Sequence, residues 1–185
     1  MSSEMLTALD RINANAERLI GSVSAEQWDG STPCREWTVR DLVNHMTGTT
    51  TFLGAAAARR TPDGPPDADH LGDDPLGSFS AAAAATTAAW RSEGALEGMV
   101  SIPVEMPAVA CLGVNIIDTG THCWDLATAI GADVGLSADL VAMIDQWNRQ
   151  IVSDEVRSGG GFGSAVEPGD DSALSSMLAF VGRQG

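Results

Sequence analysis

Residues 107–130 read PAVACLGVNIIDTGTHCWDLATAI, and they decide the fold. Their apolar side chains recur at helical spacing on one broad arc, and further apolar residues make much of the opposite face apolar as well. Gly131 follows directly and is a typical stop signal for a helix. A helix that is apolar nearly all round is expected to be buried. We therefore predict a buried helix over this stretch, which other helices must cover.

The remaining sequence predicts further helices and little else. Apolar residues at helical spacing indicate helices over 4–20, 38–59, 76–91, 138–156 and 172–181. Thr38 and Asp41 are spaced as in a capping box, which starts a helix. Residues 98–106 favour a short strand or extended coil, and the Pro-, Gly- and Asp-rich residues 60–75 form a long loop. Because strands do not alternate with helices, the sequence predicts an all-α bundle in a single domain over 1–185.

Composition and charge exclude several classes of partner. The net charge is −15, and all ten basic residues are Arg. Such an anionic chain repels phosphate groups, so neither nucleic acid nor an anionic membrane is expected as a partner. No apolar run is long enough to span a bilayer, and acidic residues interrupt the N-terminal segment, which argues against a signal peptide. We therefore expect a cytoplasmic protein. The three cysteines form no CxxC pair and indicate neither a disulfide framework nor a zinc knuckle.

Three polar residues interrupt the buried helix on one strip. Asp118, His122 and Asp125 are separated by four and seven residues, and such offsets return to nearly the same direction on a helix. Between Arg91 and Arg149 the only basic side chain is His122, against eight acidic ones. A buried carboxylate without a cation costs on the order of several kcal/mol. A protonated His122, an arginine from another helix or a metal ion must therefore neutralise Asp118.

The metal alternative has a definite chemistry. An Asp and a His one helical turn apart direct two ligands to one point, and a third ligand from a neighbouring helix leaves a coordination position open. His45 lies at the edge of the apolar arc of the 38–59 helix, whereas His70 falls in the long loop and is expected to be solvated. By spacing alone, Asp118 and His122 are equally an ordinary helical pair, and that alternative stays open.

Other residues near these positions have both functional and structural interpretations. Asp125 could accept a hydrogen bond from a ligand histidine and fix its tautomer, or it could bond to backbone or an arginine. Trp37 and Trp124 are interpreted as packing residues that flank the site. Cys34 precedes a helix start, where the pKa of a thiol can fall, but a packing role is favoured. Cys123 is assigned to the core, whereas Cys111 lies on the same strip as Asp118 but about 10 Å along the helix axis, too far to share its metal.

Two motifs together give the sequence a family resemblance. Residues 31–46, STPCREWTVRDLVNHM, resemble a signature of the DinB-like superfamily, in particular of small proteins related to the metal-binding domain of mycothiol-dependent maleylpyruvate isomerase. Residues 118–127, DTGTHCWDLA, are similar to the second signature of that branch. The end of the chain, at residues 162–163 and 178–183, also matches this branch.

The resemblance implies a four-helix bundle with a long crossover loop, to which this chain adds a C-terminal helix. It also implies a divalent metal, commonly zinc, on three side chains, which are His45, Asp118 and His122 here. Two departures matter. The isomerase has Glu where this chain has Asp118, and it has a further C-terminal domain that contributes to its active site. Maleylpyruvate isomerisation itself is therefore not expected of this chain.

The predicted metal site and the family resemblance together suggest two classes of function. The first is a metal-dependent enzyme, similar to a thiol transferase or isomerase, that activates mycothiol or another small thiol for attack on a small electrophile. A hydrolase that uses metal-bound water is a variant with the same ligands. The second class is a non-catalytic metal-binding or stress-response bundle. The resemblance also allows a homodimer, and the local residues name neither the electrophile nor a separate catalytic base.

Overall fold

Helices form almost all of the regular structure. The structure is a computed structural model that describes residues 2–65, 68–101, 104–159 and 162–184. The elements in these ranges are α1 (Ser2–Gly21), α2 (Val39–Ala57), α3 (Pro75–Trp90), β1 (Met99–Ser101), β2 (Glu105–Pro107), α4 (Ala108–Ile130), α5 (Ala138–Ile151), α6 (Asp154–Ser158) and α7 (Ala173–Phe180). They divide into two compact units, Met1–Val134 and Gly135–Gly185. The predicted all-α class is confirmed, whereas the single domain stays a prediction.

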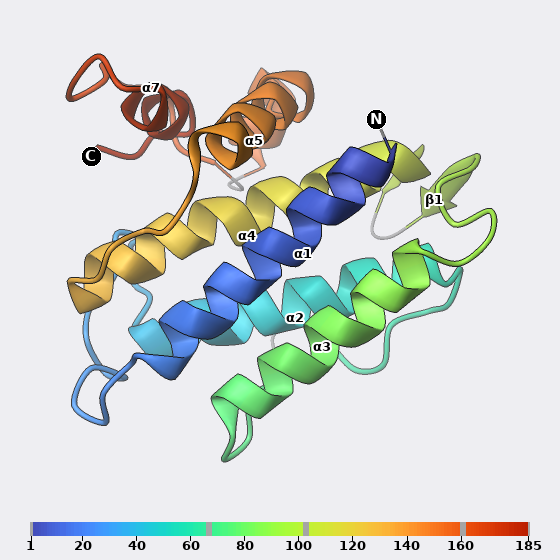
Figure 1. Cartoon of the computed structure of the whole chain (residues 1–185), viewed down its shortest axis with the longest axis horizontal. Coiled ribbons are helices and arrows are strands. Elements are labelled where there is room, and N and C mark those ends of the chain that lie inside the picture. The colour runs from blue at the N-terminus through green and yellow to red at the C-terminus, as the bar shows by residue number, and fades with distance from the viewer. Residues whose placement is uncertain (1, 66–67, 102–103, 160–161, 185) are drawn as a thin grey trace. The chain divides into compact units, whose positions relative to one another are not determined.

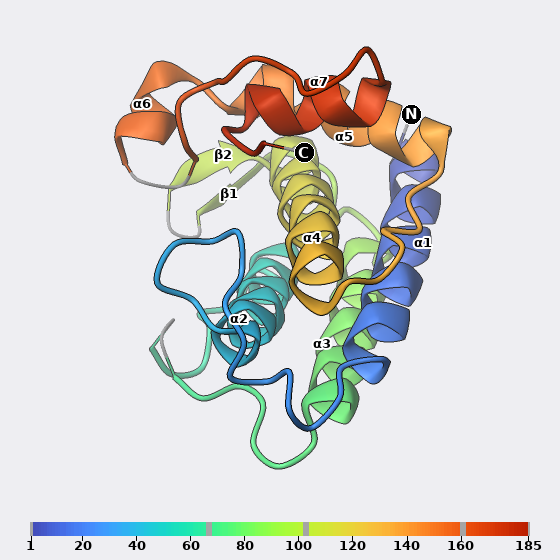
Figure 2. The same ribbon diagram turned by 90° about the vertical axis from the view of Figure 1, so that its left-hand side faces the viewer.

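The first unit is a four-helix bundle. Helices α1 and α2 each pack against both α3 and α4, so α1 lies opposite α2 and α3 lies opposite α4 (Figures 1 and 2). The connections 22–38 and 91–107 therefore cross the bundle, whereas the long loop 58–74 joins two neighbouring helices. The short hairpin of β1 and β2 pairs Val100 with Met106 and lies in the second crossing connection.

Helix α4 is buried as its sequence predicts. Fifteen of its 23 residues are buried, and Ile116 and Ile117 have at most 1% of their surface exposed. Each such side chain contributes about 1.5–3 kcal/mol when it leaves water. Gly131 ends the helix in the left-handed conformation, at φ 68°, which glycine adopts without a steric penalty. The interior of the bundle is therefore built around the helix that carries the Asp118 strip.

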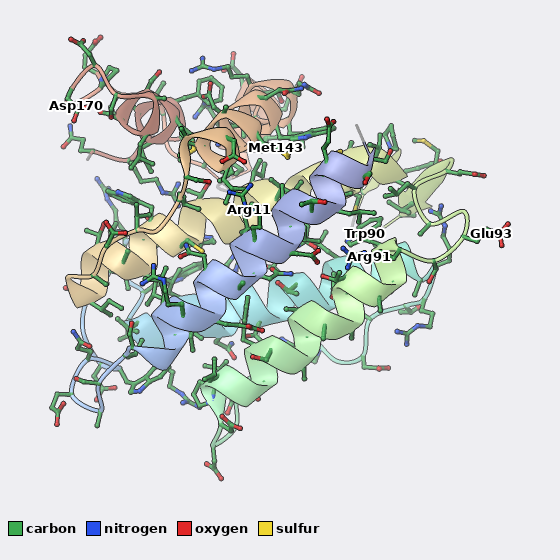
Figure 3. All side chains as sticks on the ribbon, in the orientation of Figure 1. Arg11, Trp90, Arg91, Glu93, Met143 and Asp170 are labelled. Atoms are coloured by element: carbon green, nitrogen blue, oxygen red, sulfur yellow. The ribbon has the colours of Figure 1, made fainter. Side chains whose placement is uncertain are left out.

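The end of α3 is tied to two other helices. Trp90 is buried and donates from Nε1 to Oδ1 of Asn115 on α4, at 3.3 Å. The neighbouring Arg91 forms an ion pair with Asp10 of α1, and Figure 3 shows this arginine at the end of α3 beside α1. The buried Trp90 and one exposed ion pair thus fix the end of α3, and of these two Trp90 provides more of the stabilisation.

Helix α2 begins as predicted and also holds the long loop. Thr38 accepts a hydrogen bond from the backbone of Asp41, whose carboxylate bonds back to the Thr38 backbone, so the capping box is confirmed. Asn44 then bonds to the loop backbone at Ala68 and His70, at 2.9 and 2.7 Å. The ring of His70 lies against Gly48, where an added Cβ would come within 2.7 Å of it. His70 is thus packed on α2, whereas the sequence predicts a solvated side chain.

The second unit differs from the prediction in one helix. The predicted helix over 138–156 ends at Ile151, because Val152 adopts a ψ of 86°, outside the helical range. Ser153 then caps α6 by accepting a hydrogen bond from the backbone of Val156. Helix α5 packs against α7, which is the predicted C-terminal helix. In the described parts of both units, no helix combines the length and apolarity needed to cross a membrane.

Candidate metal centre

Two neighbouring helices bring the predicted ligands together. His45 comes from the second turn of α2, and Asp118 and His122 come from successive turns of α4. Nε2 of His45 lies 3.2 Å from Oδ1 of Asp118, and Nε2 of His122 lies 3.7 Å from the same oxygen. One ligand atom from each of the three residues falls within 4.8 Å of the others. Residues 73 positions apart in sequence thus converge on one point because α2 packs on α4.

The spacing of these atoms fits a tetrahedral metal ion. Metal–nitrogen and metal–oxygen bonds of about 2.0–2.1 Å place neighbouring ligand atoms of a tetrahedron about 3.3 Å apart. The separations of 3.2 and 3.7 Å from Asp118 to the two imidazoles are close to that value. Two imidazole nitrogens and one carboxylate oxygen form a ligand set that suits zinc and similar divalent ions. The three residues therefore fit the metal that the sequence resemblance implies.

The ligand cluster is partly open on one side. The side chain of His45 is 33% exposed, whereas those of Asp118 and His122 are 16% and 10% exposed. A small molecule can therefore approach from the His45 side, while the α4 residues form the inner wall. Partial burial also strengthens charge interactions at this point relative to those at the surface.

The pKa of His45 shows how the cluster balances charge without a metal. Burial alone lowers the pKa of this imidazole, but the hydrogen bond and charge of Asp118, together with the charge of Asp125, outweigh it. The net result is a pKa above the ordinary value for histidine. Asp118 thus favours the protonated, cationic form of the His45 imidazole beside it. A metal ion would take the place of this cation and displace the proton.

Asp125 determines which nitrogen of His122 can bind a metal. Asp125 is fully buried, and its Oδ2 lies 2.8 Å from Nδ1 of His122. A carboxylate only accepts hydrogen bonds, so Nδ1 carries the proton. In the neutral imidazole Nε2 is then the unprotonated nitrogen, and it is directed at the point shared with Asp118 and His45. A carboxylate in this position orients a ligand histidine and raises its basicity.

Cys34, for which the sequence favours a packing role, lies within hydrogen-bonding distance of this site. Its thiol donates to Oδ2 of Asp125 at 3.3 Å and lies 3.9 Å from Nδ1 of His122. Cys34, His122 and Asp125 thus form a second group of possible metal ligands. The 2.8 Å separation between Asp125 and His122 is a hydrogen-bond length and is short for two ligands of one ion. We therefore interpret this group as a hydrogen-bond network behind the predicted metal ligands.

The loop before α2 brings Cys34 and Trp37 to the site. Thr32 closes a tight turn, because its hydroxyl bonds to the backbone of Cys34 and its own N–H bonds to the carbonyl of Trp37. Glu36 completes the turn at a φ of 67°, in the left-handed region. The ring of Trp37 then lies 4.7 Å from that of His45 and 6.0 Å from that of His122. Trp37 thus lies beside both imidazoles, closer to that of His45.

Three other residues that the sequence singles out lie elsewhere. Trp124 follows His122 by two positions, about 200° around α4, and has no ring contact with either site histidine among the described residues. Its predicted flanking role stays a prediction. Cys111 and Cys123 are both fully buried, as expected of core residues. Burial raises the pKa of Cys111 to about 11 and that of Cys123 to about 12.

These thiol environments predict selective alkylation. Iodoacetamide is expected to modify Cys34 well before Cys111 or Cys123, because only Cys34 is partly exposed and the other two thiols do not ionise near neutral pH. Mass spectrometry of peptides from protein quenched at successive times measures the order. Protein unfolded in guanidinium, in which all three cysteines react, is the control. Equal labelling of Cys34 and Cys111 in the folded protein would contradict the structure.

The site residues fall within one recognisable family domain. The family model described as the mycothiol maleylpyruvate isomerase N-terminal domain matches residues 9–127, a range that holds every residue of the metal centre. The chain belongs to this family. An uncharacterised protein of Mycobacterium tuberculosis strain H37Rv is 32% identical over 169 residues, which cover 89% of this chain and 90% of that protein. Its counterpart in strain CDC 1551 gives the same identity and coverage.

Solved structures of the same family share the fold. The crystal structure of the mycothiol-dependent maleylpyruvate isomerase superposes with a TM-score of 0.64 at 19% identity, covering 86% of this chain and 72% of the isomerase. A mutant of the isomerase gives a TM-score of 0.63 at 18% identity, covering 83% of this chain and 73% of the mutant. At this identity the likeness establishes the fold alone, and the predicted bundle of this family is confirmed.

Proposed function

We propose that this member of the family binds a divalent metal, with zinc as the first candidate, through His45, Asp118 and His122. We further propose that it activates a small thiol such as mycothiol for attack on a small electrophile. The observation that carries the proposal is the convergence of two imidazoles on one carboxylate oxygen, at 3.2 and 3.7 Å. Membership of a family named for a mycothiol-dependent isomerase supports the identity of the thiol.

Each residue of the site has a part in this function. A divalent metal with an open position binds a thiol as its thiolate near neutral pH. His45, Asp118 and His122 hold the metal, and Asp125 keeps Nε2 of His122 unprotonated. The thiol of Cys34 donates a hydrogen bond to the same carboxylate oxygen of Asp125 that faces His122, and this bond fixes the orientation of the carboxylate. Trp37 lies beside the imidazoles and excludes water from one side, while the partly exposed His45 marks the side open to substrates.

Cobalt spectroscopy can test this proposal directly. Metal-free protein loaded with Co²⁺ is titrated with mycothiol, with N-acetylcysteine as a second thiol and N-acetylserine as the control that lacks sulfur. Both thiols are expected to add a near-ultraviolet sulfur-to-cobalt charge-transfer band, and N-acetylserine to add none. If Co²⁺ binds but neither thiol changes the spectrum, thiol activation is wrong and a non-catalytic metal-binding role is favoured. If Co²⁺ does not bind at all, the metal assignment is wrong.

A further inference from the structure

A pocket lies at the C-terminal end of α2, and none of the predicted metal ligands lines it. Its volume is about 500 Å³, and its walls include Phe52 near the end of α2, Arg59 and Arg60 just beyond it, and Ser101 of β1. Phe52 follows His45 by seven residues, which is about 10 Å along the helix axis. The pocket is therefore not part of the ligand cluster, and a molecule can bind in it whether or not a metal is present.

The charge of this pocket is opposite to that of the chain as a whole. The chain has 25 acidic residues and only ten arginines, yet two adjacent arginines line this pocket, and none of its lining residues in the described part of the chain is acidic. Within the described residues, neither Arg59 nor Arg60 forms an ion pair with a carboxylate. By contrast, Arg91 pairs with Asp10 and Arg149 pairs with Asp145. The described lining of the pocket therefore presents two guanidinium groups that are not paired with a carboxylate of the described residues.

Arg59 is held in position at a cost to the backbone. Its φ is 56°, in the left-handed region, which costs a residue with a Cβ about 1 kcal/mol or more. Its guanidinium nitrogens donate to the carbonyls of Met99 and Glu97 at the start of the hairpin. A guanidinium carries five N–H donors, so these two bonds orient it and leave others for a ligand. Strained residues with fixed side chains are typical of binding sites.

The other walls fit the remainder of an organic molecule. Phe52 and Ala56 provide apolar surface, and Thr61 and Ser101 provide hydroxyl groups that donate hydrogen bonds. Guanidinium groups bind carboxylates and phosphates in preference to neutral groups, because both partners of the hydrogen bond are charged. We propose that this pocket binds a small organic anion, whose carboxylate or phosphate contacts Arg59 and Arg60 and whose apolar part contacts Phe52.

Nuclear magnetic resonance titration of the full chain tests this proposal. The probes are benzoate, phenyl phosphate and inorganic phosphate, with benzamide as the neutral analogue of benzoate. Benzoate and phenyl phosphate are expected to give saturable shifts at residues 52–62 and at Ser101. Benzamide is expected to give none, because it lacks the negative charge. Inorganic phosphate shows whether the anionic group alone binds, and it is expected to bind more weakly than phenyl phosphate.

Arginine variants make the test specific. Arg60→Gln removes a side chain with no hydrogen bond to the described residues, so folding is expected to be retained, and the affinity for benzoate is expected to fall tenfold or more, as for loss of a charged hydrogen bond. Arg149→Gln removes the same charge elsewhere and should leave the affinity unchanged. Equal affinity in these two variants, or equal shifts with benzamide, would overturn the proposal. Benzoate is also expected to bind to His122→Ala, because the pocket does not contain the predicted metal ligands. Failure of the proposed metal function would therefore leave this result unchanged.

Discussion

Replacement of His122 with alanine is expected to remove tight metal binding. Structural zinc sites with four ligands bind zinc with an apparent free energy of about 10–16 kcal/mol, or about 2.5–4 kcal/mol per ligand, so the loss is on the order of 10²–10³-fold in affinity. Nε2 of His122 is 3.7 Å from Oδ1 of Asp118, and its ring is 4.9 Å from that of His45, so alanine leaves only two of the three converging side chains. Competition of zinc between the protein and a chromophoric chelator measures the affinity.

His70→Ala is the matched control for this variant. The control also removes an imidazole, but from the one histidine of the chain that does not belong to the cluster. The ring of His70 packs on Gly48 instead. The zinc affinity of His70→Ala is expected to equal that of the wild type. Far-ultraviolet circular dichroism of both variants verifies that the bundle has formed. A His122→Ala protein that is folded and binds zinc as tightly as the wild type would show that the metal ligands are wrongly assigned.

Local sequence spacing predicted the parts of the site that lie on one helix. Asp118 and His122 are one turn apart on α4, so any helix over this stretch places them together. The capping box at Thr38 likewise depends on four consecutive residues. The distance of 3.2 Å between His45 and Asp118 is different, because it depends on the packing of α2 on α4. The helical periodicity of the sequence does not predict that packing. His45 was predicted as the third ligand only through the resemblance to known signatures.

The features that sequence reasoning missed depend on backbone conformations without a local signal. Cys34 reaches Asp125 only because the turn closed by Thr32 carries Glu36 at a positive φ, which its residue type does not favour. The break after α5 occurs at Val152, where neither Gly nor Pro marks the end of a helix. His70 packs against α2 because Gly48 leaves room for its ring, and a glycine within a helix has several interpretations.

Replacement of Asp125 with asparagine is expected to weaken zinc binding 10–100-fold, although Asp125 is not itself a ligand. Asparagine has nearly the same shape and keeps one oxygen, but it carries no charge to raise the basicity of His122. If its amide nitrogen faces Nδ1, it donates a hydrogen bond there, and the ring proton moves to Nε2, where it blocks the metal. In either orientation the nitrogen that faces Asp118 becomes a poorer ligand. The chelator competition used for His122→Ala measures the change.

Asp145→Asn separates this effect from a general change of charge. It removes one negative charge from a chain whose net charge is −15, as Asp125→Asn does, but its partner is the exposed Arg149. If Asp125 acted only through the overall negative potential, the two variants would lose similar affinity. If it acts through the 2.8 Å hydrogen bond to Nδ1, only Asp125→Asn should lose affinity, and the Co²⁺ absorption spectrum of that variant should shift because one ligand donates less charge. Equal zinc affinity in Asp125→Asn and wild type would mean that His122 adopts its ligand tautomer without this carboxylate.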